Sequence, residues 1–277
     1  MTAHSIVKNK KLFIGLIMLT IFLTLGVFAP LIIPYPYDKT YVGPSLKGPS
    51  ADHWFGTDRL GRDIFSRVLY GTRVSLIAAI GVTCVSLLFG VPLGLLGGYY
   101  GGAFDMVLMR LVDVFFTFPW VLMGLLVVVI RGQGLESVII ALSLSYFPQI
   151  VRVIRSTVLA IKGQDFIAAA RLTGENDRNI IFRYILPNCF APLIVQTTII
   201  MSFSILGEAA LSYLGYGTRP PLPSWGILLQ QATNYIWGDG YLVVFPGIFI
   251  IFSVLTFNFT GDGLRDILDP RYRRIYD

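Results

Sequence analysis

Charged residues are scarce in this sequence. Only 14% of its 277 residues are Asp, Glu, Lys or Arg, whereas 55% are hydrophobic and the mean hydropathy is +0.69. A soluble domain has about 25% charged residues. This shortage excludes an ordinary soluble domain, and repeated apolar runs of about 20 residues predict a protein that crosses a membrane several times.

Histidine and cysteine are nearly absent. The histidines are His4 and His53, and the cysteines are Cys84 and Cys189. These residues show no metal-type spacing, and no nucleophile beside a base accompanies them. We expect both cysteines to be free thiols, and we expect neither a metal site nor a catalytic residue. The scarcity argues against a membrane-embedded enzyme.

Nucleotide-binding signatures are also missing. The chain has no G-x-x-x-x-G-K-S/T phosphate loop, and no loop between its apolar runs is long enough for a nucleotide-binding domain. We therefore expect the chain to bind no cofactor and not to hydrolyse ATP itself. The formal net charge of +6 is typical of membrane proteins with basic cytoplasmic loops, so nucleic-acid binding is not expected.

The sequence contains six long apolar runs. Their lengths suit helices, and they lack the alternation of barrel strands. The first run exceeds the 7–15 residues of a signal-peptide core, so we expect it to remain as a span. The six expected spans are Leu12–Ile33, Val74–Tyr99, Met106–Ile130, Leu135–Val153, Phe190–Leu211 and Tyr241–Thr260.

Lysine and arginine predict the orientation of these spans. Thirteen fall in segments on one side and eight on the other, and the cytoplasmic side carries the excess in membrane proteins. We therefore expect residues 1–11, a loop at about 154–188 and a tail of residues 261–277 to be cytoplasmic, with a membrane domain at 12–260. The basic segment Arg59–Arg73 departs from this rule, and its place relative to the membrane stays open.

Two segments that we expect on the outer side of the membrane have recognisable sequence patterns. In GTDRLGRDIFSR, the i,i+4 spacing predicts the pairs Asp58–Arg62 and Arg59–Asp63 on a surface helix. The stretch SWGILLQQATNYIWG, within residues 212–240, is amphipathic. We expect it to lie on the outer face, where it would help to receive a substrate-delivering protein.

The loop between the fourth and fifth spans is charged yet patterned for helix. Ala168, Ala169 and Ala170 favour helix after Asp165, and Gly174 suits a left-handed cap. Asn176 or Asp177 then caps a second helix, in which Ile180, Ile181, Tyr184 and Ile185 share one face while Arg178 and Arg183 face water. Leu186-Pro187 ends this helix or begins the next span. Such a hairpin either rests on lipid or docks into a cytoplasmic partner.

Ionisable residues inside spans are costly, so each is a candidate for function. Arg110 and Asp113 lie at i,i+3 and are expected to pair with one another, structurally or along a pathway. Glu208, followed by small residues, is a candidate for lining the pathway or bracing its outer gate. Pro119 is expected to kink the third span, and clusters of glycine and serine suit a pore that rearranges.

The end of the last span has a charged face. Gly261 and Gly263 are expected to loosen the exit from the membrane. Arg265, Asp266 and Asp269 follow, and they form either a solvated surface or a second contact with a cytoplasmic or membrane partner.

The charged loop resembles the "EAA" loop of ABC-transporter importer permeases. Its pattern A-A-x-x-x-G, followed by nine residues, Y, one more residue and L-P, is matched by Ala169, Ala170, Gly174, Leu186 and Pro187. Ala168 stands where Glu is usual, with Asp165 as a candidate replacement, and Tyr184 stands where Ile is usual. The resemblance implies that this loop is a coupling helix that docks on an ATPase. The residues it assigns to coupling are Asp165, Ala168, Ala169, Ala170, Gly174, Arg178, Leu186 and Pro187.

Five further strings resemble the C-type permease of dipeptide, oligopeptide and nickel importers. They are FGTDRLGRDIFSRVLYGTRVSL, LMRLVDVFFTFP, GEAALSYLGYG, PSWGILL and FNFTGDGLRDILDPR. The resemblance implies an all-α membrane fold of about six spans, the type I importer permease fold. This chain would then form half of an alternating-access pathway for small peptides in a bacterial or archaeal cell membrane.

The same resemblance implies a set of partners. These are a homologous B-type permease in a heterodimer, two ATP-binding subunits that carry ATP and Mg, an extracytoplasmic solute-binding protein, and membrane lipid. One alternative is that the same architecture imports nickel or a metal–chelator complex, although the expected spans contain no histidine. A second alternative is an ATP-independent secondary transporter or channel, which would need coupling-ion residues or an internal repeat.

Overall fold

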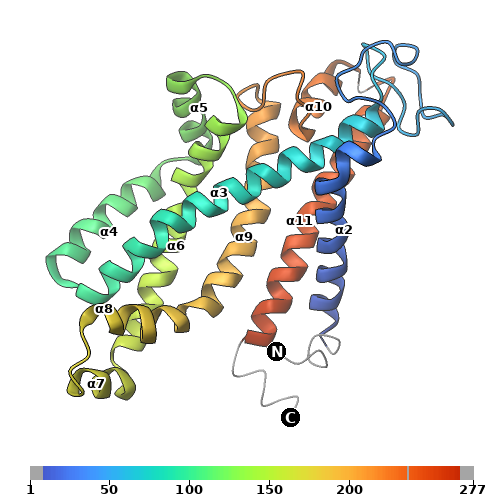
Figure 1. The fold of residues 1–277 in the computed structure, drawn as a ribbon. Helices are drawn as coiled ribbons and strands as arrows, with labels where there is room; N and C mark the ends of the chain where they lie inside the picture. The colour runs from blue at the N-terminus through green and yellow to red at the C-terminus, as the bar shows by residue number, and fades with distance from the viewer. Residues whose placement is uncertain (1–8, 236, 269–277) are drawn as a thin grey trace.

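The computed structural model describes residues 9–235 and 237–268, and these residues form helices joined by loops (Figure 1). The six spans expected from the apolar runs correspond to five long helices and one bent pair. The helices are α2 (Lys10–Ile32), α3 (Ile64–Tyr100), α4 (Gly102–Thr117), α5 (Trp120–Arg131), α6 (Leu135–Lys162), α7 (Asp165–Leu172), α8 (Asp177–Asn179), the π-helical turn η1 (Ile180–Ile185), α9 (Leu186–Tyr213), α10 (Trp225–Ala232), the short 3₁₀ turn η2 (Thr233–Tyr235) and α11 (Tyr241–Leu268).

The third expected span is broken rather than continuous. Helices α4 and α5 meet at an angle of 90°. Between them, Phe118 has an extended backbone, with φ −77° and ψ 122°, and Pro119 follows it. Because proline disfavours a helical conformation in the preceding residue, the expected kink at Pro119 is here a full break.

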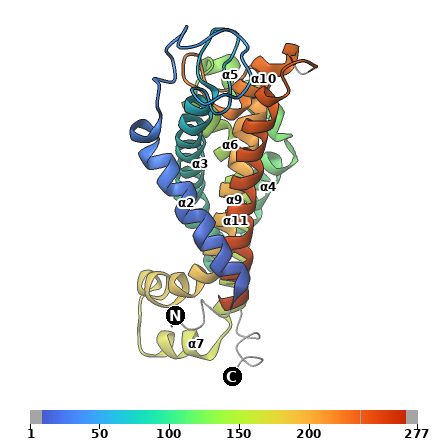
Figure 2. The same ribbon diagram turned by 90° about the vertical axis from the view of Figure 1, so that its right-hand side faces the viewer.

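The bundle has two distinct ends. Helices α7 and α8 lie at one end, the end at which α2 starts and α11 finishes (Figures 1 and 2). Helices α5 and α10 lie at the other end, together with the long segment that joins α2 to α3. These are called the α7 end and the α10 end below. The arrangement places the charged loop of residues 164–188 at the same end as both termini of the helical bundle.

The last helix extends beyond the expected membrane boundary. Helix α11 continues to Leu268, so Arg265 and Asp266 lie on the helix rather than in a tail. The expectation that Gly263 loosens this exit is wrong, because a Cβ there would lie 2.5 Å from Leu12 Cα of the packed helix α2. Asp269 lies outside the described residues.

The largest interface in the bundle is a seam between α3 and α6. Gly90, Gly94 and Gly98 of α3 follow the small-x-x-x-small spacing that lets membrane helices approach closely. A Cβ at Gly94 would lie 2.8 Å from both Ile154 Cβ and the carbonyl oxygen of Val151, and the other two glycines meet α6 in the same way. These glycines, expected to suit a rearranging pore, let α3 and α6 pack in close contact in this structure.

The segment before α3 is a folded loop and not the expected surface helix. The Asp58–Arg62 pair is confirmed, with 2.7 Å between Asp58 Oδ2 and Arg62 Nε. The Arg59–Asp63 pair is wrong, because Asp63 caps α3 by accepting from the backbone N–H of Ser66 (2.8 Å) and also contacts His53 Nδ1 (2.9 Å). This loop, residues 56–63, is called the elbow below; it packs against α3 with Asp58, Arg62 and Asp63 buried, and it holds the N-terminus of that helix.

The amphipathic outer stretch is inserted into the α10 end. Trp225 of α10 is completely buried, and its Nε1–H donates to the carbonyl oxygen of Val68 on α3 (2.9 Å). Phe22 and Phe257 pack in the same apolar cluster. The stretch thus closes this end of the bundle, and only part of it remains on the surface.

Candidate functional site

The first half of the charged loop is a short helix with one buried side. In α7, Ile167 and Ala170 are buried, whereas Asp165, Ala168 and Ala169 are exposed. The helix ends with Gly174 at φ +80°, a left-handed conformation that glycine adopts without strain. The predicted helix, its alanines and its glycine cap are thus present in the structure.

The second half of the loop runs directly into a span. Asn176 caps α8 by accepting from the backbone N–H of Asn179 (2.8 Å). Ile180, Ile181 and Ile185 are buried, and Arg178 and Arg183 are exposed, as the pattern predicted. Of the two expectations for Leu186-Pro187, the beginning of the next span is confirmed, since helix continues from Asp177 through Tyr213.

A buried tyrosine joins this loop to the end of α3. The hydroxyl of Tyr99 donates to Asp177 Oδ1 (2.5 Å), and the guanidinium carbon of Arg171 lies 5.7 Å from the centre of the ring. Lys162, at the end of α6, donates to the carbonyl oxygen of Tyr99. Three segments, α6, α7 and α8, therefore meet at this one residue of α3. Sequence reasoning missed it, because Tyr99 and Asp177 are 78 residues apart and neither belongs to the quoted loop pattern.

The outer surface of the loop exposes large apolar side chains among its charges. Leu172 is 89% exposed, and Phe166 and Phe182 are also exposed. Because a charged loop gains nothing from leaving such side chains in water, this surface suits contact with another body. Both sequence-based alternatives, lipid and a protein partner, fit that description.

The charges of the third span pair with the fourth span. Asp113 Oδ1 lies 2.6 Å from Nη2 of Arg152 on α6, and the expected Arg110–Asp113 pair is not formed. Arg155 makes two hydrogen bonds to the Asp105 carboxylate (2.6 and 2.5 Å). Arg110 is exposed. The i,i+3 spacing predicted the wrong partner for Asp113. Arg152 is 39 residues away in the sequence, and the two side chains meet only because α4 packs against α6.

A pair of amides joins the fourth and fifth spans. Gln196 Nε2 of α9 donates to Gln149 Oε1 of α6 (3.0 Å), and both residues are half-buried. The sequence did not predict this contact, because isolated glutamines in apolar runs carry no charge that would mark them as candidate functional residues.

Glu208 is enclosed near the α10 end. Its side chain is completely buried, and Oε1 accepts from Ser212 Oγ (2.7 Å) one turn further along α9. Ser75 of α3 and Ser224 before α10 also lie beside the carboxylate. The residue therefore contacts three parts of this chain and presents no open surface. Its role at an outer gate stays a prediction.

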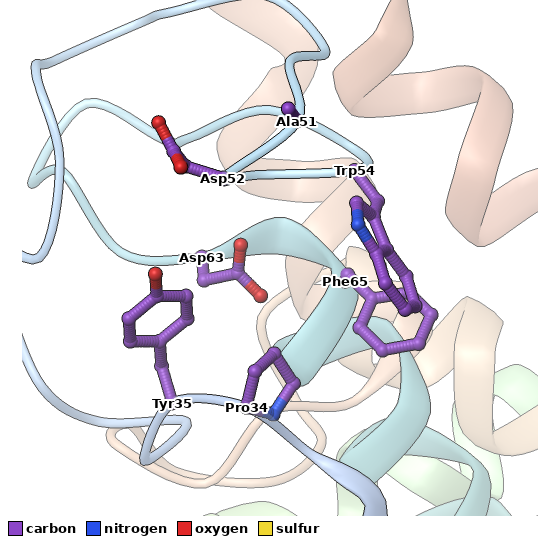
Figure 3. Close-up of a pocket in the computed structure, with 7 residues that line it drawn as sticks. All are labelled: Pro34, Tyr35, Ala51, Asp52, Trp54, Asp63 and Phe65. Carbon is purple, nitrogen blue, oxygen red and sulfur yellow. The ribbon is translucent and has the colours of Figure 1, made fainter.

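A cavity of about 290 Å³ opens beside the elbow at the α10 end. Figure 3 shows Trp54 and Phe65 on one side of it, and Asp52, Asp63 and Tyr35 on the other. The carboxylate of Asp63 is already engaged by the α3 cap and by His53. The cavity therefore offers an aromatic wall and one free surface carboxylate.

Comparison with known proteins gives two family matches. Residues 90–274 match the family described as binding-protein-dependent transport system inner membrane component. Residues 2–49 match the N-terminal TM domain of oligopeptide transport permease C. Together these matches cover the described helices except for part of α3.

Individual relatives agree with those matches. The chain is 43% identical over 266 residues to the dipeptide transport system permease protein DppC of Alkalihalophilus pseudofirmus, covering 96% of this chain and 88% of the relative. It is 40% identical to the glutathione transport system permease protein GsiD of Pectobacterium atrosepticum, over 94% of this chain and 86% of the relative. A solved structure, of inward facing conformations of the MetNI methionine ABC transporter, is similar in fold, with a TM-score of 0.62, 20% identity and coverage of 74% of this chain and 98% of that one.

Proposed function

Because this chain belongs to the binding-protein-dependent transport system inner membrane components, as a C-type peptide permease, we propose that its α7–α8–η1 loop is the coupling element that receives force from an ATPase. The chain itself is the non-catalytic permease of an ABC peptide importer. The family places it in a bacterial inner-membrane transport system as a multi-pass protein. This membership replaces the alternative of an ATP-independent transporter.

One observation carries the coupling proposal: the loop is attached to three spans. It continues from α6 through Gly163, contacts α3 at Tyr99, and enters α9 through continuous helix. A force on the exposed face of α7 would therefore displace α3, α6 and α9 together. That is the mechanical requirement for switching a pathway between outward- and inward-open states.

The proposal includes the orientation and the partners. The α7 end faces the cytoplasm, where one of two ATP-binding subunits that carry ATP and Mg docks on the loop through residues around Ala168, Ala169 and Arg178. Arg265, which is exposed, and Asp266, which is half-buried, form a second contact near the same end. A B-type permease completes the pathway, and a solute-binding protein docks at the α10 end. Support comes from the polarity of the fold, since the charged loop and the two chain-terminal helix ends share one side.

The proposed substrates are small peptides. The printed names of the relatives specify dipeptide and glutathione transport, and glutathione is itself a peptide. Nickel, or a metal–chelator complex, is the weaker candidate because none of the helices that could span the membrane contains a histidine.

Co-purification with an uptake assay tests this function. A tagged chain is extracted with its partners, every partner is identified, and the complex is rebuilt in liposomes with the solute-binding protein. We expect a second permease, two ATPases and ATP-dependent uptake of labelled trialanine. Recovery of the chain alone, or uptake that does not require ATP, would contradict the proposal. Uptake of nickel in place of trialanine would contradict only the choice of substrate.

The Tyr99 contact gives a prediction specific to coupling. Tyr99→Phe keeps the buried ring and removes the hydroxyl that binds Asp177, a loss of about 1 kcal/mol or roughly fivefold in the population of the docked loop. We expect several-fold less peptide transported per ATP hydrolysed, with unchanged amounts of assembled complex. Tyr100→Phe is the control, because the side chain of Tyr100 is 56% exposed. Equal coupling ratios in the two variants would show that Tyr99 has only a packing role.

A further inference from the structure

One face of the membrane-spanning helix α6 is polar. Ser145, Gln149, Arg152 and Ser156 follow the spacing i, i+4, i+7 and i+11. At about 100° per residue, these positions fall within an arc of about 60°. They are called the α6 polar stripe below. Such a grouping, opposite a side of the helix that is mostly apolar, marks a side with a different environment.

The opposite side of α6 is the seam with α3. Ile150, Ile154 and Val158, which meet the α3 glycines, are completely buried. The stripe, in contrast, becomes more open toward the α7 end. Ser145 and Gln149 are half-buried, whereas Arg152 and Ser156 are exposed. Toward the α7 end, the polar face is therefore the face that the rest of this chain leaves uncovered.

Neighbouring helices add polar groups on both sides of the stripe. Arg152 binds Asp113 of α4 at 2.6 Å and lies 4.0 Å above the ring of Phe116. Gln149 binds Gln196 of α9 at 3.0 Å. The stripe thus runs between α4 and α9, with one ion pair and one amide pair along its length.

The stripe starts at the α7 end of the expected span Leu135–Val153, with Arg152 at its edge, and runs into the span through Gln149 and Ser145. Lys162 contacts Tyr99 at the α7 end, and Gln149 lies about 20 Å before Lys162 at a rise of about 1.5 Å per residue. Ser145 lies another turn further. Polar and charged side chains at this depth face protein or water rather than lipid, because lipid offers them no partners. An ion pair with half-exposed side chains, 47% for Arg152 and 49% for Asp113, therefore needs an aqueous or protein surface opposite it.

We propose that the α6 polar stripe, with Asp113 and Gln196, is the surface of this chain that lines the translocation pathway and binds the peptide in transit. This inference rests on the proposed function. It concerns zwitterionic short peptides, whose recognition must not depend on their side chains.

The chemistry of the stripe suits that class of substrate. The amides of Gln149 and Gln196, and the hydroxyls of Ser145 and Ser156, can donate to and accept from any peptide backbone. Arg152 and Asp113 balance one another, so the surface has no net charge to trap a passing molecule. When a peptide binds, Arg152 can contact its terminal carboxylate and Asp113 its terminal ammonium group, in place of their contact with one another.

Thiol accessibility in the assembled transporter tests this assignment. Cys84, which is exposed, is first replaced by Ala, and Cys189 is kept because it is buried. Ser145→Cys, Gln149→Cys and Ser156→Cys are then made singly, so that one misfolded variant leaves two others. Each complex, in proteoliposomes, meets a membrane-impermeant sulfonated methanethiosulfonate on both sides of the membrane.

Leu88→Cys is the matched control. Leu88 of α3 is 67% exposed and apolar, and at about 16 Å from the Tyr99 contact it lies near the depth of Gln149. We expect the stripe positions to react at least tenfold faster than this control. We also expect trialanine, supplied with the solute-binding protein and ATP, to slow the reaction at Gln149→Cys severalfold.

Three outcomes would overturn the assignment. Labelling of the stripe no faster than at Leu88→Cys would mean that it faces lipid or protein. Disulfide cross-linking of the stripe to the partner permease, without labelling, would make it a subunit interface. Labelling that trialanine does not change would remove the peptide contact. Failure of the proposed function is separate, since it appears as absence of ATP-dependent trialanine uptake by the transporter without these substitutions.

Discussion

A Gly94→Leu variant is expected to be lost from the membrane, with less than a tenth of the normal amount of assembled transporter. Gly94 lies at the centre of the α3–α6 seam, where a Cβ alone would approach the carbonyl oxygen of Val151 and the Cβ of Ile154 to 2.8 Å. Neither neighbour can move aside, because one is helix backbone and the other belongs to a completely buried side chain. The two helices would have to separate.

The size of this effect follows from packing. Extra groups in a well-packed interior cost about 1–3 kcal/mol, and separating the seam adds the loss of contacts along the helices. Proteins have total stabilities of only about 5–15 kcal/mol, so the variant should fall below the level needed for assembly. The measurement is the amount of monodisperse complex recovered by size-exclusion chromatography.

Gly247→Leu is the control for that experiment. Gly247 also lies inside an apolar spanning helix, α11, but a Cβ there meets nothing within 4 Å. We expect near-normal recovery. If both variants are recovered equally well, the α3–α6 seam is not the tightly packed interface described above.

A Gly174→Val variant should assemble but transport poorly, with uptake reduced more than tenfold. Gly174 has φ +80° at the end of α7, and a β-branched residue in that conformation is strained by about 1–3 kcal/mol. At about 2 kcal/mol the native turn would be roughly 30-fold less favoured. Helix α7 would then no longer be presented at its native angle. ATP-dependent uptake of trialanine, normalised to the amount of complex, measures the loss.

Gly163→Val is the matched control in the same loop. Gly163 has φ −90°, which other residues adopt, and a Cβ there meets nothing within 4 Å. Uptake by this variant should stay within about twofold of normal. Normal uptake by the Gly174→Val variant would refute the proposal that the geometry of this turn transmits force.

Local features of the fold were predictable from the sequence. Each spanning helix contains an apolar run of the required length, and the coupling-loop caps at Gly174 and Asn176 depend only on residues within one turn of them. The break at Pro119 was also predictable in position. Its 90° angle was not, because the angle is set by how α4 and α5 pack on α6.

Contacts between distant helices were not predictable in the same way. The spacing of Gly90, Gly94 and Gly98 indicates close approach, but it does not identify α6 as the neighbour. Asp113 was assigned to Arg110 because spacing reveals only partners on the same helix. Tyr99 was missed altogether. In each case the partner is chosen by the packing of whole helices, which a single sequence does not encode in any short pattern.

The π-helical turn η1 affects the direction in which α7 points relative to α9. A π-helical turn contains one residue more than an α-helical turn at the same place, and η1 lies between the capped start of α8 and the long helix α9. One residue corresponds to about 100° of rotation about the helix axis. The extra residue therefore acts as a fixed angular offset that sets which way α7 and its exposed alanines point relative to the membrane-embedded face of α9. Deleting one residue here would leave the spanning length and the hydrophobicity of the helix nearly unchanged, yet the coupling surface would face the wrong direction.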